Sequence, residues 1–291
     1  MSNDRSFESE ISTLVRAALE EDIGGCDFTA MLVPADRRAH ATVISRERAV
    51  LCGAPWFEQC FREIDGAVDI DWRAKEGTEV SPGDTLCEIH GNARALLTAE
   101  RAALNFLQAL SATASATRAY VAAVAGTGAC IYDTRKTLPG LRVAQKYAVR
   151  VGGGHNHRMG LYAGVLIKEN HIAVAGGIAQ ALRAAAEIAP AGIPLQIEVE
   201  NCAELEEALV AGAKLILLDN FNVEQMRHAV RITAGRAELE ASGGITLSNL
   251  RTVAETGVDR ISIGSITKDV KAIDLSMRIA LHEGRPDVPA A

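Results

Sequence analysis

Five basic side chains fall close together in the middle of the chain, where strand-like segments end. They are Arg135, Lys136, His157, Arg158 and Lys168. Arginine presents a planar fork that matches carboxylates and phosphates, whereas lysine acts as a movable point charge. A rim salt bridge would explain any one of these arginines alone, but the group together predicts a pocket for a small ligand with two or more negative charges.

The chain as a whole is acidic, so the basic segment differs from the rest of the sequence. The 291 residues carry a formal net charge of −7, which argues against a general nucleic-acid-binding protein. Between Asp133 and Glu169, by contrast, every other charged side chain is a lysine or an arginine. An acidic protein with one concentrated basic stretch favours a site for a small polyanion over a nucleic-acid surface.

Two carboxylates, Glu198 and Asp219, end neighbouring predicted strands. One or two carboxylates completed by water and substrate phosphates are the usual protein arrangement for Mg²⁺. The pair therefore predicts a magnesium site. Glu200 points to the same side of an extended strand as Glu198 and is an alternative to it.

Glycine-containing turns close the last two predicted strands, at Ser242-Gly243-Gly244 and at Gly264-Ser265. Glycine allows backbone N–H groups to approach a phosphate closely, and barrel enzymes often bind phosphate in the loops after their final strands. A tight strand-to-helix turn would need the same residues, so both interpretations stay open here.

Lys168 also fits a second chemistry. A lysine at a strand end can form a Schiff base with a carbonyl substrate when its neutral amine is favoured, and nearby arginines would favour it. The same arginines are what an anion pocket needs. Spacing alone does not separate a Schiff-base aldolase from an anion-binding site.

The elements that must position these residues follow a repeating pattern from residue 129 onward. Apolar strand candidates begin near residues 129, 165, 194, 214, 237 and 260. Helical stretches lie between them, for example at 202–211, 223–233 and 247–256. Nearly every strand ends in polar or glycine residues, and the active site of a closed α/β barrel lies at the carboxyl ends of its strands. The pattern predicts a parallel α/β barrel.

The first part of the chain differs. An amphipathic helix from Phe7 is followed by short strand-like runs separated by turns, and then by a long alanine-rich helix over about residues 98–117. This mixture predicts an α/β (α+β) sandwich. We therefore expect three segments: a sandwich domain at 1–116, a barrel domain at 117–270, and a helix at 271–291 that packs back on the first domain.

Other features exclude whole classes of protein. The chain starts without a basic stretch followed by an apolar run, and its longest uncharged stretch, 119–132, is too short for a membrane span. The six cysteines include no CxxC pair, which indicates reduced thiols rather than a disulfide framework or a zinc site. We expect a cytoplasmic protein with no membrane partner.

The longest basic motif carries a family resemblance. The run DTRKTLPGLRVAQKYAVRVGGGHNHRMGLYAGVLIKENHI at 133–172 resembles the signature of the quinolinate phosphoribosyltransferases, which are type II phosphoribosyltransferases. Shorter matches follow the family's order along nearly the whole chain. They are EEDIGGCDFT at 20–29, AERAALNFLQ at 99–108, IEVEN at 197–201, LLDNF at 217–221, ASGGI at 241–245 and SIGS at 262–265.

The resemblance implies a fold and a reaction. The fold is an N-terminal α/β sandwich followed by an incomplete barrel of six or seven strands. The enzyme would be a pentosyltransferase that joins quinolinate to phosphoribosyl pyrophosphate, with Mg²⁺, and releases nicotinate mononucleotide, CO₂ and pyrophosphate for NAD biosynthesis. It would act as a homodimer.

The resemblance also implies a role for each matching residue. Arg135, His157, Arg158 and Lys168 would surround the quinolinate carboxylates, and Arg101 would enter that pocket from the other subunit. The phosphoribosyl side would take a second set, in which both acids act through Mg²⁺ and the ribose hydroxyls. That set is Lys136, Glu198, Asp219, Ser242, Gly243 and Gly264.

Two positions depart from the family's usual pattern. Ala163 stands where the family commonly has Asp, and Leu138 stands where it often has Thr. Three alternatives remain beside the phosphoribosyltransferase: a related paralogue associated with molybdenum transport, a Schiff-base aldolase that uses Lys168, and a non-catalytic anion-binding protein of the same fold.

Overall fold

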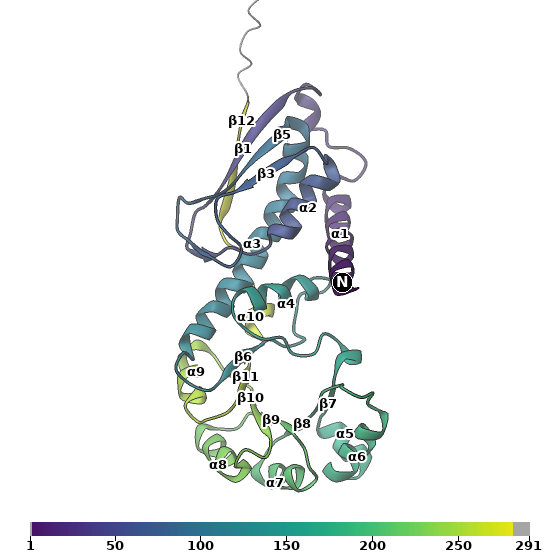
Figure 1. Ribbon diagram of the computed structural model, residues 1–291, viewed down its shortest axis with the longest axis vertical. Helices are drawn as coiled ribbons and strands as arrows, with labels where there is room; N and C mark the ends of the chain where they lie inside the picture. The colour runs from purple at the N-terminus through teal and green to yellow at the C-terminus, as the bar shows by residue number, and fades with distance from the viewer. Residues whose placement is uncertain (1, 282–291) are drawn as a thin grey trace, which may run out of the picture. The chain divides into compact units, whose positions relative to one another are not determined.

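The computed structural model describes residues 2–281, and these form two compact units (Figure 1). Within the described residues, the first unit comprises 2–115, 143–151 and 270–281, and the second comprises 116–142 and 152–269. The first break lies beside the predicted boundary at residue 116. Segment 143–151 differs from the prediction, because it belongs to the first unit and not to the barrel.

The first unit is built from helices and a small antiparallel sheet. Its elements are α1 (Ser2–Ile23), η1 (Ala30–Leu32), β1 (Arg38–Ser45), β2 (Ala49–Val50), α2 (Ala54–Ile64), β3 (Asp69–Trp72), β4 (Glu79–Val80), β5 (Thr85–Asn92), most of α3 (Ala93–Ala123), most of α4 (Arg142–Val151) and β12 (Leu275–Leu281). The sheet has the order β12-β1-β5-β3, and β2 pairs separately with β4. This arrangement confirms the predicted sandwich.

Alternation along β1 explains why this sheet has one covered face. Ala39, Ala41 and Val43 are buried, whereas the residues between them are partly exposed. Successive side chains of a strand point to opposite faces, so only one face packs against helices. Figure 1 shows α2 and α3 against the sheet, and the fully buried rings of Trp56 and Phe57 in α2 help to form the core.

The end of the described chain corrects the predicted C-terminal helix. Leu275–Leu281 is a strand that pairs antiparallel with β1, from Ser45 opposite Leu275 to Ala39 opposite Leu281. Apolar residues at 275, 277, 279 and 281 alternate with Ser276, Arg278 and Ala280, which is a strand period. The prediction overlooked this alternation, although the chain does return to the first unit. Residues 282–291 of the predicted helix lie outside the described residues.

The second unit is the predicted incomplete barrel. Its elements are β6 (Cys130–Tyr132), η2 (Leu161–Ala163), β7 (Val165–Ile167), α5 (Glu169–Ala175), α6 (Ile178–Ile188), β8 (Leu195–Val199), α7 (Cys202–Val210), β9 (Leu215–Asp219), α8 (Val223–Thr233), β10 (Glu238–Ser242), α9 (Leu247–Ala254), β11 (Arg260–Ser262) and α10 (Ser265–Lys268). The six parallel strands have the order β6-β11-β10-β9-β8-β7. Within residues 2–281, this is the cyclic order of a barrel that lacks one pairing, between β6 and β7.

The barrel strands bury different chemistry on their two faces. In β8, Ile197 and Val199 are fully buried, and they alternate with the buried polar residues Gln196 and Glu198. In β10, buried Glu240 likewise alternates with apolar neighbours. Because the side chains of a strand alternate between faces, one face of β8 and of β10 is apolar and the other carries polar groups into the barrel.

Two further observations concern the cysteines and the longest helices of the described chain. All six cysteines are free thiols, and burial raises the pKa of Cys60 to about 12. Among residues 2–281, no helix combines the length and the apolar character that crossing a bilayer requires.

Candidate active site

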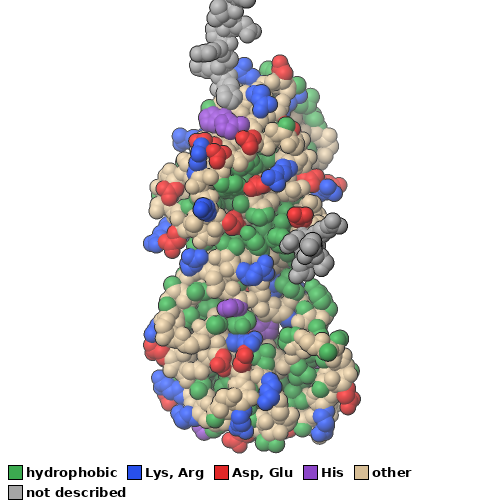
Figure 2. All heavy atoms as spheres, in the orientation of Figure 1, with side chains coloured by type: hydrophobic (Ala, Val, Ile, Leu, Met, Phe, Trp, Pro, Cys, Tyr) green, Lys and Arg blue, Asp and Glu red, His purple; other side chains and the backbone are tan. Residues whose placement is uncertain are grey.

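A cavity of about 490 Å³ opens at the carboxyl ends of the barrel strands. The predicted site residues that line it are Arg135, Lys136, His157, Arg158, Lys168, Glu198, Asp219, Ser242 and Gly243. The structure therefore brings the basic group and the acidic pair together. On the face of the second unit visible in Figure 2, histidine, basic and acidic side chains also lie close to one another.

A larger cavity of about 820 Å³ shares Arg135, Arg158 and Lys168 with the first. The rest of its lining is mostly apolar and includes Val174 and Ile188 from α5 and α6. Because the smaller cavity holds carboxylates as well as these cations, we place the chemistry there.

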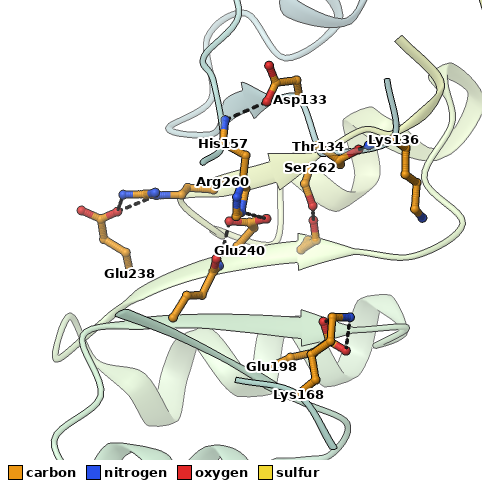
Figure 3. A network of polar contacts seen from close by, with 12 residues as sticks. Asp133, Thr134, Lys136, His157, Lys168, Glu198, Glu238, Glu240, Arg260 and Ser262 are labelled. Atoms are coloured by element: carbon orange, nitrogen blue, oxygen red, sulfur yellow. Dashed lines mark hydrogen bonds and ion pairs between the residues drawn. The ribbon is translucent and has the colours of Figure 1, made fainter. Parts of the chain in front are cut away.

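The loop that carries His157 and Arg158 is held by a buried carboxylate. Asp133, directly after β6, is fully buried and accepts a hydrogen bond from Asn156 Nδ2 at 2.7 Å. It accepts another from the His157 backbone N–H at 2.7 Å (Figure 3). Hydrogen bonds to an ionised acceptor are stronger than neutral ones. Asp133 thus fixes the backbone just before Arg158.

A second buried carboxylate holds the other end of His157. Glu240 Oε1 lies 3.3 Å from His157 Nε2, and Glu240 Oε2 accepts a hydrogen bond from Gln196 Nε2 at 2.9 Å (Figure 3). Burial by itself would raise the pKa of Glu240, but hydrogen bonds and charge from His157, with hydrogen bonds from Gln196 and Ser262, lower it below the ordinary value. The floor of the cavity is therefore anionic beneath His157.

Lys168 and Glu198 form an ion pair across the β7–β8 edge. Lys168 Nζ lies 2.9 Å from one Glu198 oxygen and 3.1 Å from the other (Figure 3). Glu198 is 9% exposed, whereas the Lys168 side chain is 45% exposed. The lysine can therefore turn toward a ligand more easily than the glutamate can.

Arg158 is aimed by a backbone contact and is close to a second arginine. Its Nη1 donates to the Gly164 carbonyl at 2.8 Å. Burial, followed by the positive charge of Arg135, lowers the pKa of Arg158. Two guanidinium groups that repel each other in a partly buried place favour an anion between them.

Lys136 is held by its backbone while its side chain stays exposed. Its N–H donates to Thr134 Oγ1 at 3.0 Å, and its carbonyl accepts from Thr267 Oγ1 at 2.9 Å. Gly264 lies against the Lys136 chain, because a Cβ at that position would come within 3.1 Å of Lys136 Cδ. Gly264 does not line the cavity, but it leaves room for the lysine that does.

The turn after β9 packs against the turn after β10. Asn220 has a left-handed backbone (φ 55°), and its Nδ2 donates to Asp219 Oδ2 at 2.8 Å. Gly243 has φ 97°, and a Cβ there would overlap the Asn220 side-chain oxygen. Glycine at residue 243 therefore allows the two turns to pack closely beside Ser242 and Asp219, which are partners in the β9–β10 pairing.

Several predicted or alternative residues lie elsewhere. Gly244 and Ser265 do not line the cavity, and the Ser265 hydroxyl lies 3.3 Å from the Tyr120 hydroxyl. Glu200 is exposed and outside the cavity, so Glu198 is the residue of the pair that faces it. Arg101 lies exposed on α3, in the part of the helix that belongs to the first unit. Ala163 and Leu138 do not line the cavity either.

Sequence reasoning assigned no role to the residues that support the site. They are Thr134, Asp133, Gln196, Asn220 and Glu240. A signal for Gln196 and Glu240 was present, because polar residues at every second position interrupt strands that a buried parallel sheet would make continuously apolar. Asp133 and Asn220 gave no such signal, since a polar residue after a strand is also typical of an ordinary turn.

Glu198 and Asp219 fit a magnesium ion that substrate phosphates help to hold. Among the described side chains, no group of three or more His, Cys, Asp or Glu residues is placed to bind a metal without other ligands. Two carboxylates in one cavity suit Mg²⁺, which keeps several waters and takes one or two protein carboxylates. Direct ligation by Glu198 would compete with its contact to Lys168.

The cavity thus offers cations to one anionic ligand and carboxylates to a neighbouring hydroxyl or metal ion. Comparison with known families agrees with this chemistry. Residues 27–111 match the family described as "Quinolinate phosphoribosyl transferase, N-terminal domain", and residues 113–278 match its C-terminal domain.

Individual proteins with similar sequences and structures carry related names. The chain is 42% identical over 285 residues to the "Nicotinate-nucleotide pyrophosphorylase [carboxylating]" of Mycobacterium leprae, covering 95% of this chain and 99% of that one. It is 39% identical over 272 residues to the "Probable nicotinate-nucleotide pyrophosphorylase [carboxylating]" of Bacillus subtilis, covering 94% of both. The nicotinate-nucleotide pyrophosphorylase structure from Francisella tularensis superposes with a TM-score of 0.91 at 43% identity, over 94% of this chain and 97% of that one.

Proposed function

This chain belongs to the quinolinate phosphoribosyltransferase family, and we propose that its strand-end cavity is where the family's reaction takes place. The reaction transfers phosphoribosyl from phosphoribosyl pyrophosphate to quinolinate, with loss of CO₂ and pyrophosphate, and yields nicotinate mononucleotide for NAD biosynthesis. One observation carries this assignment: a single cavity of about 490 Å³ collects Arg135, Arg158 and Lys168 together with Asp219.

Quinolinate occupies the cationic side of the cavity. Its two carboxylates take charge-assisted hydrogen bonds from Arg135 and Arg158, while Lys168 and His157 add positive charge or donors. Asp133 and Glu240 hold His157 at its backbone and its ring. Quinolinate therefore meets a His157 ring and an Arg158 side chain that are held by protein contacts before it binds, which reduces the entropy lost on binding.

Phosphoribosyl pyrophosphate occupies the opposite rim. Lys136 contacts its phosphates, and the backbone beside Ser242 and Gly243 approaches them closely. Gly264 leaves room for Lys136. Asp219 and Glu198 face the ribose hydroxyls and would hold Mg²⁺, which supplies charge neutralisation for the departing pyrophosphate.

The transfer step separates charge, and the cavity matches both halves. When the bond from ribose C1 to pyrophosphate breaks, negative charge grows on the leaving group and positive charge grows on the ring. Lys136 stabilises the first, and a carboxylate such as Asp219 stabilises the second. Holding the pyridine nitrogen in line with C1 supplies the entropic part of the acceleration.

Decarboxylation follows from the bond just formed. Once the pyridine nitrogen carries the ribose, the adjacent 2-carboxylate can leave as CO₂, because the pyridinium accommodates the electron pair left on the ring. A proton then replaces the lost group. No covalent bond between the enzyme and the substrate is required.

The geometry and the relatives favour this reaction over the alternatives. A Schiff base needs a lysine amine that is free to reach a carbonyl carbon, whereas Lys168 Nζ contacts both carboxylate oxygens of Glu198, at 2.9 and 3.1 Å. The relatives named above carry the carboxylating activity in their names, which supports quinolinate as the substrate over the molybdenum-associated paralogue.

Further parts of the proposal concern assembly and place. We propose that the protein is a homodimer in which Arg101 enters the partner's quinolinate pocket. The family resemblance and the exposure of Arg101 on α3 support this. We also propose a cytoplasmic location, which the six free thiols support.

A direct assay tests the proposed function. Purified protein with quinolinate, phosphoribosyl pyrophosphate and Mg²⁺ is expected to form nicotinate mononucleotide, with one pyrophosphate and one CO₂ released for each product. A chelator should stop the reaction, and borohydride with substrate should leave the enzyme active. Quinolinate binding by calorimetry without any pyrophosphate release would instead identify a non-catalytic anion-binding protein.

A further inference from the structure

One arginine joins the two loops that carry the quinolinate-binding cations. Arg142 donates from Nη2 to the Arg135 carbonyl at 3.2 Å and from Nη1 to the Met159 carbonyl at 3.2 Å. Its Nε also donates to Thr137 Oγ1 at 3.1 Å. Two of these acceptors lie on the loop after β6, and the third lies on the loop that follows His157 and Arg158.

The three contacts need the shape of arginine. A guanidinium group carries five N–H donors in a rigid plane, so it can donate in several fixed directions at once. A lysine has one nitrogen and cannot reach acceptors on both loops with the same geometry. Arg142 is itself absent from the lining of the cavity, so it acts at a distance from the ligand.

The location of Arg142 is not explained by helix stability. It is the first residue of α4, and the first turn of that helix has no acidic residue. The N-terminal end of a helix dipole is positive, so a cation there is unfavourable. What offsets this placement is the set of contacts to the two loops.

The Arg142 contacts oppose the repulsion between the positive charges of Arg135 and Arg158. Arg135 and Arg158 are near enough for the charge of Arg135 to contribute, after burial, to the lowered pKa of Arg158. Without a ligand, like charges favour a wider separation of their loops. A link between the Arg135 and Met159 carbonyls resists that separation.

We propose that Arg142 is a positioning residue that sets the spacing of Arg135 and Arg158 for the two quinolinate carboxylates. This inference rests on the proposed function. The inference predicts different effects on the two substrates. Lys136 on the phosphate side has backbone contacts to Thr134 and Thr267 that do not involve Arg142.

Paired variants test this separation by calorimetry with each substrate. Arg142→Ala is expected to weaken quinolinate binding about tenfold or more, the loss typical of hydrogen bonds from a charged donor. Phosphoribosyl pyrophosphate binding should change by less than about threefold. Thr267→Val should show the opposite preference, and exposed Arg183→Ala serves as the matched control.

Rescue distinguishes positioning from a general loss of structure. Millimolar guanidinium should restore much of the quinolinate affinity of Arg142→Ala. The guanidinium ion can occupy the space that the arginine side chain vacates between the two loops. Arg142→Lys should be intermediate. Amide exchange in residues 134–141 and 156–160 of the protein without substrate should be faster in Arg142→Ala, a readout that does not depend on catalysis.

Two results would overturn the inference. One is equal weakening of both substrates by Arg142→Ala without rescue, and the other is unchanged quinolinate binding. If the wild-type protein itself fails to bind quinolinate, the proposed function is wrong. If the wild type binds and Arg142→Ala binds equally well, only the role of Arg142 is wrong.

Discussion

Both units have apolar cores, but they differ in where carboxylates are buried. In the first unit, Trp56, Phe57 and Phe61 are fully buried, and the Phe57 and Phe61 rings lie 5.1 Å apart. In the second unit, Asp133 and Glu240 are fully buried and ionisable. Among the described residues, the buried carboxylates therefore lie in the second unit, next to the cavity, and not in the first.

The difference teaches where stability and chemistry come from. Burying apolar rings gives favourable free energy with no partner requirement, whereas each buried carboxylate must be matched by donors to avoid a net loss. In the barrel, the buried carboxylates Asp133 and Glu240 have such donors, and these contacts hold His157 in place. Substitutions in the two interiors should therefore have different consequences.

The largest expected effect is on the stability of the first unit. Phe57→Ala should lower the free energy of unfolding by about 3–5 kcal/mol, because a large buried ring leaves a cavity. Activity per folded molecule should stay near the wild-type value. Chemical denaturation measures the loss, and Phe28→Ala, at a ring that is 80% exposed, is the matched control. An equal loss in both variants would contradict the assigned core.

Arg158→Ala in the second unit should impair substrate binding and leave stability nearly unchanged. It should weaken quinolinate binding by about 100-fold or more, since a partly buried cation that meets a carboxylate is lost. Binding of phosphoribosyl pyrophosphate should be largely kept, and thermal stability should change little. Calorimetric titration of each substrate checks this, with Arg183→Ala as the control. Comparable loss of both substrates would mean that Arg158 serves the whole cavity.

Glu240→Gln tests how a buried carboxylate of the barrel contributes to folding stability as the pH changes. The pKa of Glu240 is lowered in the folded protein, so the folded state binds protons less readily than the unfolded state does. Its ionisation thus stabilises the fold above the ordinary carboxyl pKa of 4.5, and that contribution is lost as the pH falls through the folded-state pKa.

At neutral pH, Glu240→Gln should therefore cost about 1–3 kcal/mol of unfolding free energy. The gap to the wild type should narrow below pH 4.5. Denaturation at several pH values measures this gap, and Glu200→Gln at an exposed position is the matched control. A gap that widens with acid would contradict an ionised Glu240.

The smallest expected effect is a partial recovery of activity in mixed dimers, which tests whether a residue of the first unit contributes to the active site. Arg101 lies in the first unit and Lys136 in the second. If Arg101 serves the partner's pocket, mixing inactive Arg101→Ala and Lys136→Ala proteins should restore about a quarter of wild-type activity, because half of the dimers would have one intact site. Activity that stays at the level of the separate variants would count against a shared site.

Much of the fold was predictable because it follows local patterns. The helix at Val223–Thr233 was predicted to the residue, and the six barrel strands begin at or near the predicted positions. Hydrophobic periodicity determines such elements over a few turns of chain. The strand at Leu275–Leu281 was missed, although its alternation was present, because its partner β1 is more than 200 residues away in the sequence.

The sequence by itself determined that separate strand ends carry cations, carboxylates and glycines, and that the chain resembles a phosphoribosyltransferase. Only the tertiary structure decided that Glu198 faces the cavity while Glu200 does not, and that Asp133, Glu240 and Arg142 hold the loops in place. The physical reason is distance along the chain. Residue types and short periods are local properties, whereas a hydrogen bond from Gln196 to Glu240 exists only after the strands that carry them have entered the same barrel.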